Sequence, residues 1–487
     1  MLQRSLSLLL LPLVSRALTP QEFGVVATVV VTVSVVNVVL AAPFEIALFR
    51  SVVRSEDPTL IGTERHSRRY LTRTVPIVAL LSAACIYAGS IVASGRFDSH
   101  GQLWALEVAA AGFLAAITSY GLTVARASDQ LGTFVAVSGL WSLTLVALKA
   151  ILVVAVDMGA LGWILADLLA SGIGYALVMR KIAKNRKSLE SPGGSWRSVA
   201  STALALVPHR LSFWVLASIT RPLCSLLFPS SSVGIFAMAV SLASVSLLVL
   251  AELNNAVLLN YASEDSQVPT VKTSGVARVQ FLLSSVIPSA YSLALLFVAP
   301  WVVGKSFSDA VPLVSFMLIG HIAYGIYVIP MNYIVHASGR VRLSSSSSTA
   351  GAIAVIVFMV ISGRLGSLTL AALSPSVGYV VMMGVAFLLN ARIELVDDWR
   401  FVFPRWFIFV PWLLTPFFCL AFLASTTGGL FEELLHGRAQ SIFGLLGFSS
   451  LLLVSAAACL PNFAFRTFHG SQSAQDRPRT PLANHGA

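Results

Sequence analysis

Charged residues are scarce in this sequence. Asp, Glu, Lys and Arg together make up 11% of its 487 residues, whereas a typical soluble domain carries about 25%. Hydrophobic residues make up 56% of the chain, and the mean hydropathy is +0.84. Because a soluble fold cannot bury so large an apolar fraction, the composition excludes a soluble globular protein and indicates an integral membrane protein.

The sequence also lacks the residue patterns of metal sites and of common enzymes. Its four cysteines, Cys85, Cys224, Cys419 and Cys459, show no CxxC spacing and lie in or beside apolar segments. We therefore interpret them as small packing residues. No Walker motif, HExxH motif or nucleophile elbow is present. The sequence predicts a protein that is not an enzyme and that holds neither a metal nor a cofactor.

Long uncharged runs are abundant. Residues 24–40, 131–148 and 233–250 are uncharged and mostly apolar, and each run is long enough to cross a hydrocarbon layer of about 30 Å as a helix. The alternation of apolar and polar residues that marks the strands of a membrane barrel does not organise these runs. We therefore predict an all-α integral membrane protein with about 14 transmembrane helices, at residues 2–20, 23–47, 74–94, 102–124, 132–154, 158–179, 199–220, 234–259, 279–300, 310–335, 343–362, 367–389, 404–426 and 439–460.

The formal net charge of +11 indicates topology rather than nucleic-acid binding. With the N-terminus inside, 24 of the 32 Lys and Arg residues fall in the predicted inner segments and 6 in the outer ones, while Lys149 and Arg210 fall within helices. Such an excess on one side is typical of the cytoplasmic face of a membrane protein. We therefore predict a multi-pass protein of the plasma (inner) membrane with both termini in the cytoplasm and no nucleic-acid partner.

The chain is predicted to contain two related halves. Residues 18–24 (LTPQEFG) and 228–234 (FPSSSVG) each follow an apolar helix and open a long helix, and the two segments are 210 residues apart. Six helices per half give both halves the same orientation, which predicts two pseudo-symmetric six-helix bundles around a central cavity. The predicted parts are a first lobe at 1–187, a cytoplasmic linker at 188–198, a second lobe at 199–392, an extra helix pair at 404–460 and a disordered cytoplasmic tail at 461–487.

Few ionisable residues fall within the predicted helices, and those that do are functional candidates because charge is costly inside a membrane. Glu107 and Lys149 lie at similar depth in the first lobe, so we interpret them as a structural ion pair, with a role in transport as the alternative. Asp167 and Arg210 both lie near mid-depth. Arg210 is therefore predicted either to contact an anionic substrate in the central cavity or to neutralise Asp167.

Carboxylates and amides near the cytoplasmic ends of two equivalent helices form a second group of candidates. Glu45 and Glu252 lie where a carboxylate is able to carry a coupling proton or cation, and the alternative is a position at the membrane interface without a role in coupling. Asn254 and Asn255 are candidate cavity residues, although amides also serve helix packing in membranes.

The segment at residues 12–24 (PLVSRALTPQEFG) resembles the opening of polysaccharide-export flippases of the O-antigen, capsule and teichuronic-acid type. These flippases form part of the multidrug, oligosaccharidyl-lipid and polysaccharide exporter superfamily. Members commonly show a first helix that ends in an Arg, here Arg16, then a turn containing Pro and Gly, and then a long apolar helix. We therefore add Arg16 to the candidate cavity residues.

The resemblance implies a cavity between two six-helix bundles that opens alternately to each side of the membrane. Through it, such a protein moves a lipid (undecaprenyl) diphosphate-linked oligosaccharide from the cytoplasmic to the outer leaflet. The implied partners are membrane lipid, the lipid-linked glycan itself, and a glycan polymerase or glycosyltransferases.

Two other functions remain as alternatives. A multidrug or cation antiporter of the same superfamily usually has twelve helices, and the first predicted helix here contains no Asp or Glu. A membrane glycosyltransferase or polymerase would need a sizeable outer loop that carries carboxylates. The predicted outer loops are all short, which favours the flippase over both alternatives.

Overall fold

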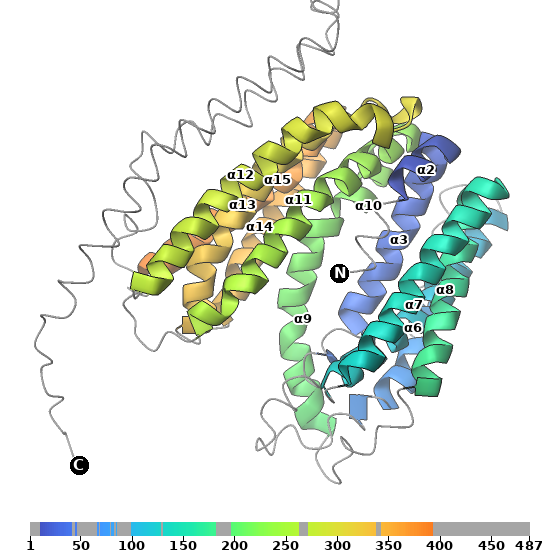
Figure 1. Cartoon of the computed structure of the whole chain (residues 1–487), viewed down its shortest axis with the longest axis horizontal. Helices are drawn as coiled ribbons and strands as arrows, with labels where there is room; N and C mark the ends of the chain where they lie inside the picture. Colours follow the sequence, from blue (N-terminus) through green and yellow to red (C-terminus); the bar gives the residue numbers. More distant parts are fainter. Residues whose placement is uncertain are drawn as a thin grey trace, which may run out of the picture. The chain divides into compact units, whose positions relative to one another are not determined.

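A computed structural model describes residues 10–40, 44–45, 66–67, 69–77, 79–81, 84, 99–127, 130–181, 196–262, 271–337 and 342–392. These residues are mostly helical, and no strand occurs among them. The elements, of which Figure 1 labels the α-helices, are α2 (Leu11–Ala17), α3 (Pro20–Leu40), α6 (Ser99–Ala127), α7 (Leu131–Lys149), η2 (Ala150–Ala155), α8 (Gly159–Lys181), α9 (Trp196–Ser218), α10 (Thr220–Leu227), α11 (Ser230–Ala262), α12 (Val271–Val302), η4 (Lys305–Phe307), α13 (Ala310–Asn332), η5 (Tyr333–Ala337), α14 (Arg342–Arg364) and α15 (Leu368–Arg392).

Six spans within the described residues are long and apolar enough to cross a membrane. This confirms the predicted all-α class and the multi-pass character. The count of fourteen helices stays a prediction, because the predicted helices at 404–426 and 439–460 and the tail at 461–487 lie outside the described residues. The six spans are Leu131–Ala155, Gly159–Arg180, Ser230–Leu258, Ala310–Val335, Leu343–Arg364 and Leu368–Arg392.

Two short turns connect pairs of these spans and depend on residues with positive φ. Between η2 and α8, Asp157 has a φ of 56° and Gly159 a φ of 57°. Between α14 and α15, Gly366 has a φ of 64°. Glycine adopts this conformation without steric cost, so each turn reverses the chain within a few residues and places the two flanking helices side by side.

The contacts divide the chain into two compact units. Unit 1 comprises Met1–Val245, Val298–Met317 and Ser345–Val381, and unit 2 comprises Ser246–Phe297, Leu318–Ser344 and Met382–Ala487. The division cuts through α11, α12, α13, α14 and α15. It therefore does not test the predicted lobe boundaries, and the linker predicted at 188–198 lies mostly outside the described residues.

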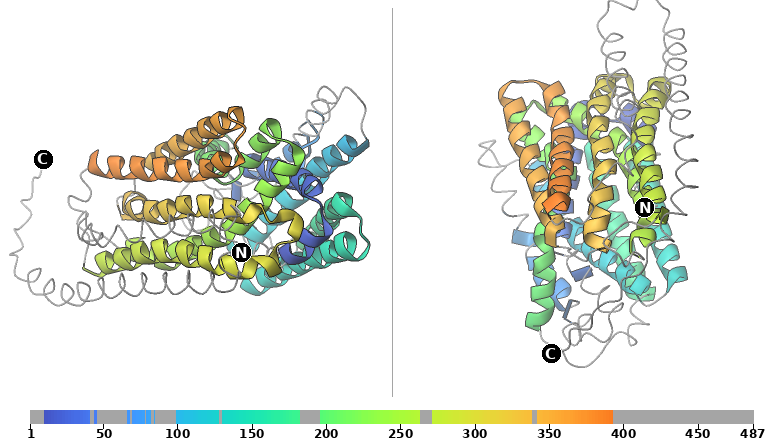
Figure 2. Two further views of the ribbon diagram at one scale, coloured as in Figure 1. Left: turned by 90° about the horizontal axis from the view of Figure 1, so that it is seen from above. Right: turned by 90° about the vertical axis from the view of Figure 1, so that its left-hand side faces the viewer.

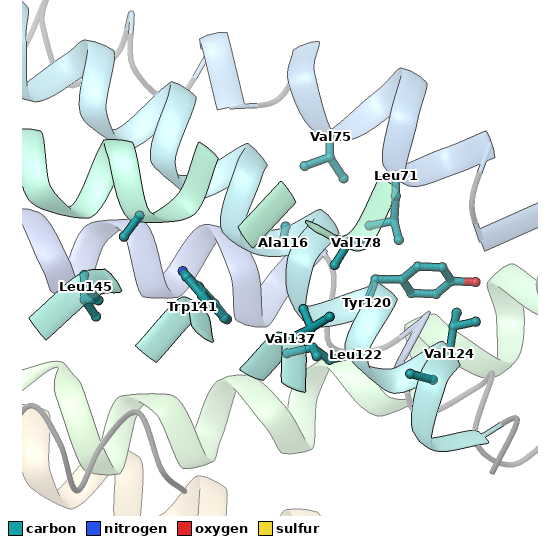
Figure 3. Close-up of a cluster of buried hydrophobic side chains, with 12 residues drawn as sticks. Leu71, Val75, Ala116, Tyr120, Leu122, Val124, Val137, Trp141, Leu145 and Val178 are labelled. Carbon is teal, nitrogen blue, oxygen red and sulfur yellow. The ribbon is translucent and has the colours of Figure 1, made fainter. Parts of the chain in front are cut away.

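In unit 1, α6, α7 and α8 pack closely around an apolar core. Figure 3 shows Tyr120 of α6, Trp141 of α7 and Val178 of α8 among the buried side chains of this core. Glycines allow the close approach: a Cβ atom on Gly121 would overlap the side chain of Val178, and Gly174 lies against the Trp141 ring. Small residues at helix contacts are the usual means by which membrane helices pack, because burial of apolar surface gives little driving force in lipid.

Candidate functional site

The turn between α2 and α3 contains a capping box. The Thr19 backbone N–H and hydroxyl both donate to Oε2 of Glu22, at 2.9 Å each, and the Glu22 backbone N–H donates to the Thr19 hydroxyl at 3.3 Å. Pro20 follows Thr19 as the first residue of α3, where its missing N–H costs no helical hydrogen bond. The sequence TPQE at residues 19–22 therefore begins α3 at a fixed residue.

Arg16 and Ser15 attach this turn to the C-terminal end of α12 and to Gly304 just after it. The Arg16 guanidinium donates to the carbonyl oxygen of Pro12 at 2.5 Å and to that of Trp301 at 2.7 Å. The Ser15 hydroxyl donates to the Val302 carbonyl at 3.2 Å and accepts the Gly304 N–H at 2.9 Å. In this structure the Arg16 side chain thus binds backbone carbonyls, and its predicted contact with a substrate stays a prediction.

The turn between α10 and α11 repeats the backbone of the first turn at the predicted offset of 210 residues. Leu18 N–H donates to Val14 O and Phe228 N–H donates to Cys224 O, each at 2.9 Å, and Leu18 and Phe228 are both extended. A proline occupies the equivalent positions 12 and 222. These equivalences support the predicted relation between the two halves.

The two turns also contact each other reciprocally within unit 1. A Cβ atom on Gly24 would lie 2.8 Å from the Ser230 carbonyl oxygen, and a Cβ atom on Gly234 would overlap the Pro20 carbonyl oxygen. At the offset of 210 residues, position 230 is equivalent to 20 and position 234 to 24. Each half therefore places its glycine against the equivalent carbonyl of the other half. Such an exchange of identical contacts is characteristic of a two-fold interface.

Lys149 forms an ion pair with Asp167, a pairing that was not predicted. Its Nζ atom lies 2.8 Å from Oδ1 of Asp167 and 3.9 Å from the centre of the Trp163 ring. The Lys149 side chain is 6% exposed and that of Asp167 18%. The predicted partners were Glu107 for Lys149 and, as one of two alternatives for Arg210, Asp167. The side chains of Glu107 and Arg210 lie outside the described residues, so these two predictions are not tested.

The turn at Asp157 explains the observed pair. Lys149 precedes this turn and Asp167 follows it by a similar number of residues, so the two side chains meet across the two helices that the turn joins. The π-helical turn of η2 lies between Lys149 and the reversal. Equal distance in sequence from a predicted turn is a signal that would have identified Asp167 as the partner.

Figure 2 shows the α11, α12 and α13 segments of unit 2 running alongside one another, and an amide network joins them. The Asn254 Oδ1 atom accepts hydrogen bonds from Gln280 Nε2 at 2.9 Å and from Asn332 Nδ2 at 2.8 Å, and Tyr261 OH donates to Gln280 Oε1 at 2.9 Å. Asn254 therefore has a packing role in this unit, whereas its neighbour Asn255 is exposed. Gln280 and Tyr261 were not among the predicted residues.

The two carboxylates predicted to carry a coupling ion lie in different units. Glu252 on α11 belongs to unit 2, is partly buried, and has an Oε1 atom without a hydrogen-bond partner among the described residues. Glu45 belongs to unit 1 and is also partly buried. No cluster of three or more metal-ligating side chains occurs in the described ranges. Both coupling roles therefore stay predictions.

Arg221 is a functional candidate that the sequence analysis missed. Its charge was counted with the predicted outer segments, after the helix expected at 199–220. The structure places it at the second residue of α10, whose first turn accommodates Pro222. The side chain is partly buried, and its guanidinium lies 3.4 Å from the Ser241 hydroxyl.

Comparisons with known proteins agree with this fold. Residues 1–264 match a protein family described as Polysaccharide biosynthesis protein. A solved structure of the lipid II flippase MurJ in an inward closed conformation is similar, with a TM-score of 0.63 and 11% identity over 95% of this chain and 98% of that chain. An inward-facing multidrug resistance MATE family transporter of the MOP superfamily gives a TM-score of 0.58 and 12% identity over 80% of this chain and 94% of that chain. No curated protein sequence matches.

Proposed function

The chain belongs to the polysaccharide biosynthesis protein family, and from this premise we propose that it flips a lipid diphosphate-linked oligosaccharide across the plasma membrane. The substrate enters from the cytoplasmic leaflet and leaves to the outer leaflet. The lipid is an undecaprenyl chain, and the partners are the glycosyltransferases or glycan polymerase that make and use the glycan.

The family match is the observation that carries the proposal, and the fold supports it. The chain is a multi-pass membrane protein with the fold of transporters and flippases of the multidrug, oligosaccharidyl-lipid and polysaccharide exporter superfamily. A fold shared at 11% to 12% identity is consistent with more than one substrate. The choice of glycan over drug therefore rests on the family and not on the fold.

Transport proceeds by alternating access, in which the cavity opens first to one side and then to the other. An anionic diphosphate requires a cation along its path, because charge is costly in the hydrocarbon layer. We assign this contact to Arg210, which lies on α9. The finding that Asp167 already pairs with Lys149 supports this role over neutralisation of Asp167. Glu45 and Glu252 are the candidates for binding a coupling ion.

The test uses purified protein in vesicles that contain a fluorescent polyprenyl diphosphate-linked oligosaccharide. A membrane-impermeant reductant destroys the fluorophore in the outer leaflet, so the protein should increase the destroyed fraction from about half toward all of it. We expect Arg210→Ala to reduce the rate at least about tenfold and Arg210→Lys to restore part of it, because lysine keeps the charge without the planar guanidinium.

Arg180→Ala is the matched control, because Arg180 is an exposed arginine on α8. This variant should flip the lipid at the wild-type rate. A wild-type protein that leaves the lipid-linked glycan in place but exports a cationic dye would overturn the proposed function in favour of the multidrug antiporter. Normal flipping by Arg210→Ala would reject the role of Arg210 alone.

A further inference from the structure

Arg221 lies at a position where the first half of the chain carries an apolar residue. The equivalent of Arg221 at the 210-residue offset is Leu11 in α2, which is 7% exposed. Pro12 and Pro222 follow these two residues, and α2 and α10 end in the same way. Because α2 forms the same turn with leucine, the local fold does not require an arginine at position 221.

The guanidinium of Arg221 lacks a counter-ion within the described ranges. The Nη2 atom lies 3.4 Å from the Ser241 hydroxyl on α11, at the outer limit of a hydrogen bond. The Nε atom is buried and has no hydrogen-bond partner in the part of the chain that the structure describes. Lys149, the other buried cation described above, pairs with Asp167. The Lys149 ammonium thus contacts a carboxylate and an aromatic ring, whereas the described contact of the Arg221 guanidinium is with one hydroxyl.

A partly buried cation without a counter-ion is costly in an apolar environment. Since the turn forms without an arginine at the equivalent position in the first half, binding of an external anion gives the charge at position 221 a role. The guanidinium presents several N–H donors in a planar fork that matches phosphate oxygens. The phosphates of lipid headgroups are the most abundant anions at the surface of a membrane. We propose that Arg221, positioned by Ser241, binds the phosphate group of a membrane lipid at the α10–α11 turn.

Two lipids supply this chemistry: the diphosphate-linked glycan and an anionic phospholipid. The first source rests on the proposed function, and the second does not. A site for the diphosphate would be a second substrate-binding site, in addition to the one assigned to Arg210. A site for a phospholipid would hold a lipid against the turn during transport.

The experiment measures lipid binding by native mass spectrometry of the detergent-purified protein. The probes are farnesyl diphosphate, dioleoyl phosphatidylglycerol and, as an uncharged-headgroup reference, dioleoylglycerol. The variants are Arg221→Leu, which reproduces the residue of the first half, and Arg221→Lys. Lys305→Gln is the control, because it removes an exposed cation from the η4 segment of the same unit.

We expect Arg221→Leu to weaken binding of at least one phosphate-bearing probe about tenfold or more, with Arg221→Lys intermediate and Lys305→Gln unchanged. A loss confined to farnesyl diphosphate assigns the site to the glycan lipid, and a loss that includes phosphatidylglycerol assigns it to lipid phosphates in general. Binding of dioleoylglycerol should be the same in all variants.

Thermal unfolding in the absence of added lipid separates binding from a structural role. Arg221→Leu should unfold at a temperature equal to or above that of the wild type, because it removes a cation without a counter-ion. A lower unfolding temperature together with unchanged binding of both phosphate probes would overturn the assignment. If the wild type itself binds phosphatidylglycerol and not farnesyl diphosphate, the proposed function is weakened while the phosphate site stands.

Discussion

At the scale of single residues, Lys149 shows how an apolar helix accommodates a cation. Its ammonium group is 2.8 Å from a carboxylate oxygen and lies over an indole ring, whose negative face attracts cations. Trp163 is fixed in turn by an edge-to-face contact with Phe23 at a centroid distance of 6.1 Å. The capping-box turn that begins α3 thus supports the ion pair through one aromatic contact.

Removing one member of this pair should destabilise the protein. Lys149→Met leaves the Asp167 carboxylate buried without a counter-ion, and loss of one partner of a buried pair costs about 3 to 5 kcal/mol. We expect a lower unfolding temperature in detergent and less folded protein in the membrane. The double variant Lys149→Met with Asp167→Leu removes both charges and should recover most of this stability. Equal stability of the wild type and the Lys149→Met single variant would refute a structural role for the pair.

At the scale of elements, the capping-box turn and its equivalent 210 residues later form one reciprocal contact. Helices α3 and α11 begin at these turns, and Gly24 and Gly234 allow the backbones of the two helices to approach closely. Phe23 also packs against Phe307 of η4 at a centroid distance of 5.6 Å. The short motif that resembles the export flippases therefore has a physical role, since it begins a helix and supplies the glycine of a helix crossing.

Any side chain at position 234 should disturb this crossing. Gly234→Ala places a Cβ atom on the Pro20 carbonyl oxygen, and overpacking of this kind costs about 1 to 3 kcal/mol. We expect a lower unfolding temperature. Gly139→Ala is the matched control, because nothing lies within 4 Å of a Cβ atom there. The control should be neutral or more stable by up to about 1 kcal/mol, since alanine favours the helix. The contact would be unimportant if both variants behaved alike.

At the scale of the whole molecule, the orientation in the membrane stays a prediction of the charge distribution. The described spans identify a multi-pass protein, but length and apolar composition do not say which face is cytoplasmic. The excess of 24 over 6 basic residues predicts which face is cytoplasmic, because the side of the membrane with more Lys and Arg is the cytoplasmic one. The predicted linker at 188–198 and the start of α6 at Ser99 lie on opposite faces in this topology.

Cysteine labelling should establish the orientation. In a variant without the four native cysteines, Ser99→Cys should react with a membrane-impermeant maleimide in intact cells, and Ser188→Cys should react only after the cells are opened. Ala116→Cys is the control, because Ala116 is fully buried and should stay unlabelled in both conditions. The reverse pattern for Ser99→Cys and Ser188→Cys would show that the predicted topology is inverted.

Much of the fold could be predicted because it depends on local properties of the chain. Hydropathy and run length placed α13 and α14 within a few residues of their observed bounds, predicted at 310–335 and 343–362. The repeated turn was visible because Pro and Gly recur at fixed positions around it. Such signals need no knowledge of neighbouring helices. The short helix α10, which holds Arg221, was not predicted, because its eight residues are too few to give a hydropathy signal.

The sequence by itself determined that the protein is a helical membrane protein, and it contained the turn on which the resemblance to the family rests. Only the tertiary structure decided which charges meet: Lys149 with Asp167, and Arg221 with no carboxylate among the described residues. The physical reason is that lipid-facing and protein-facing sides of a membrane helix are both apolar. Hydropathy therefore does not fix the rotation of a helix about its axis, and that rotation selects the partner of each polar side chain.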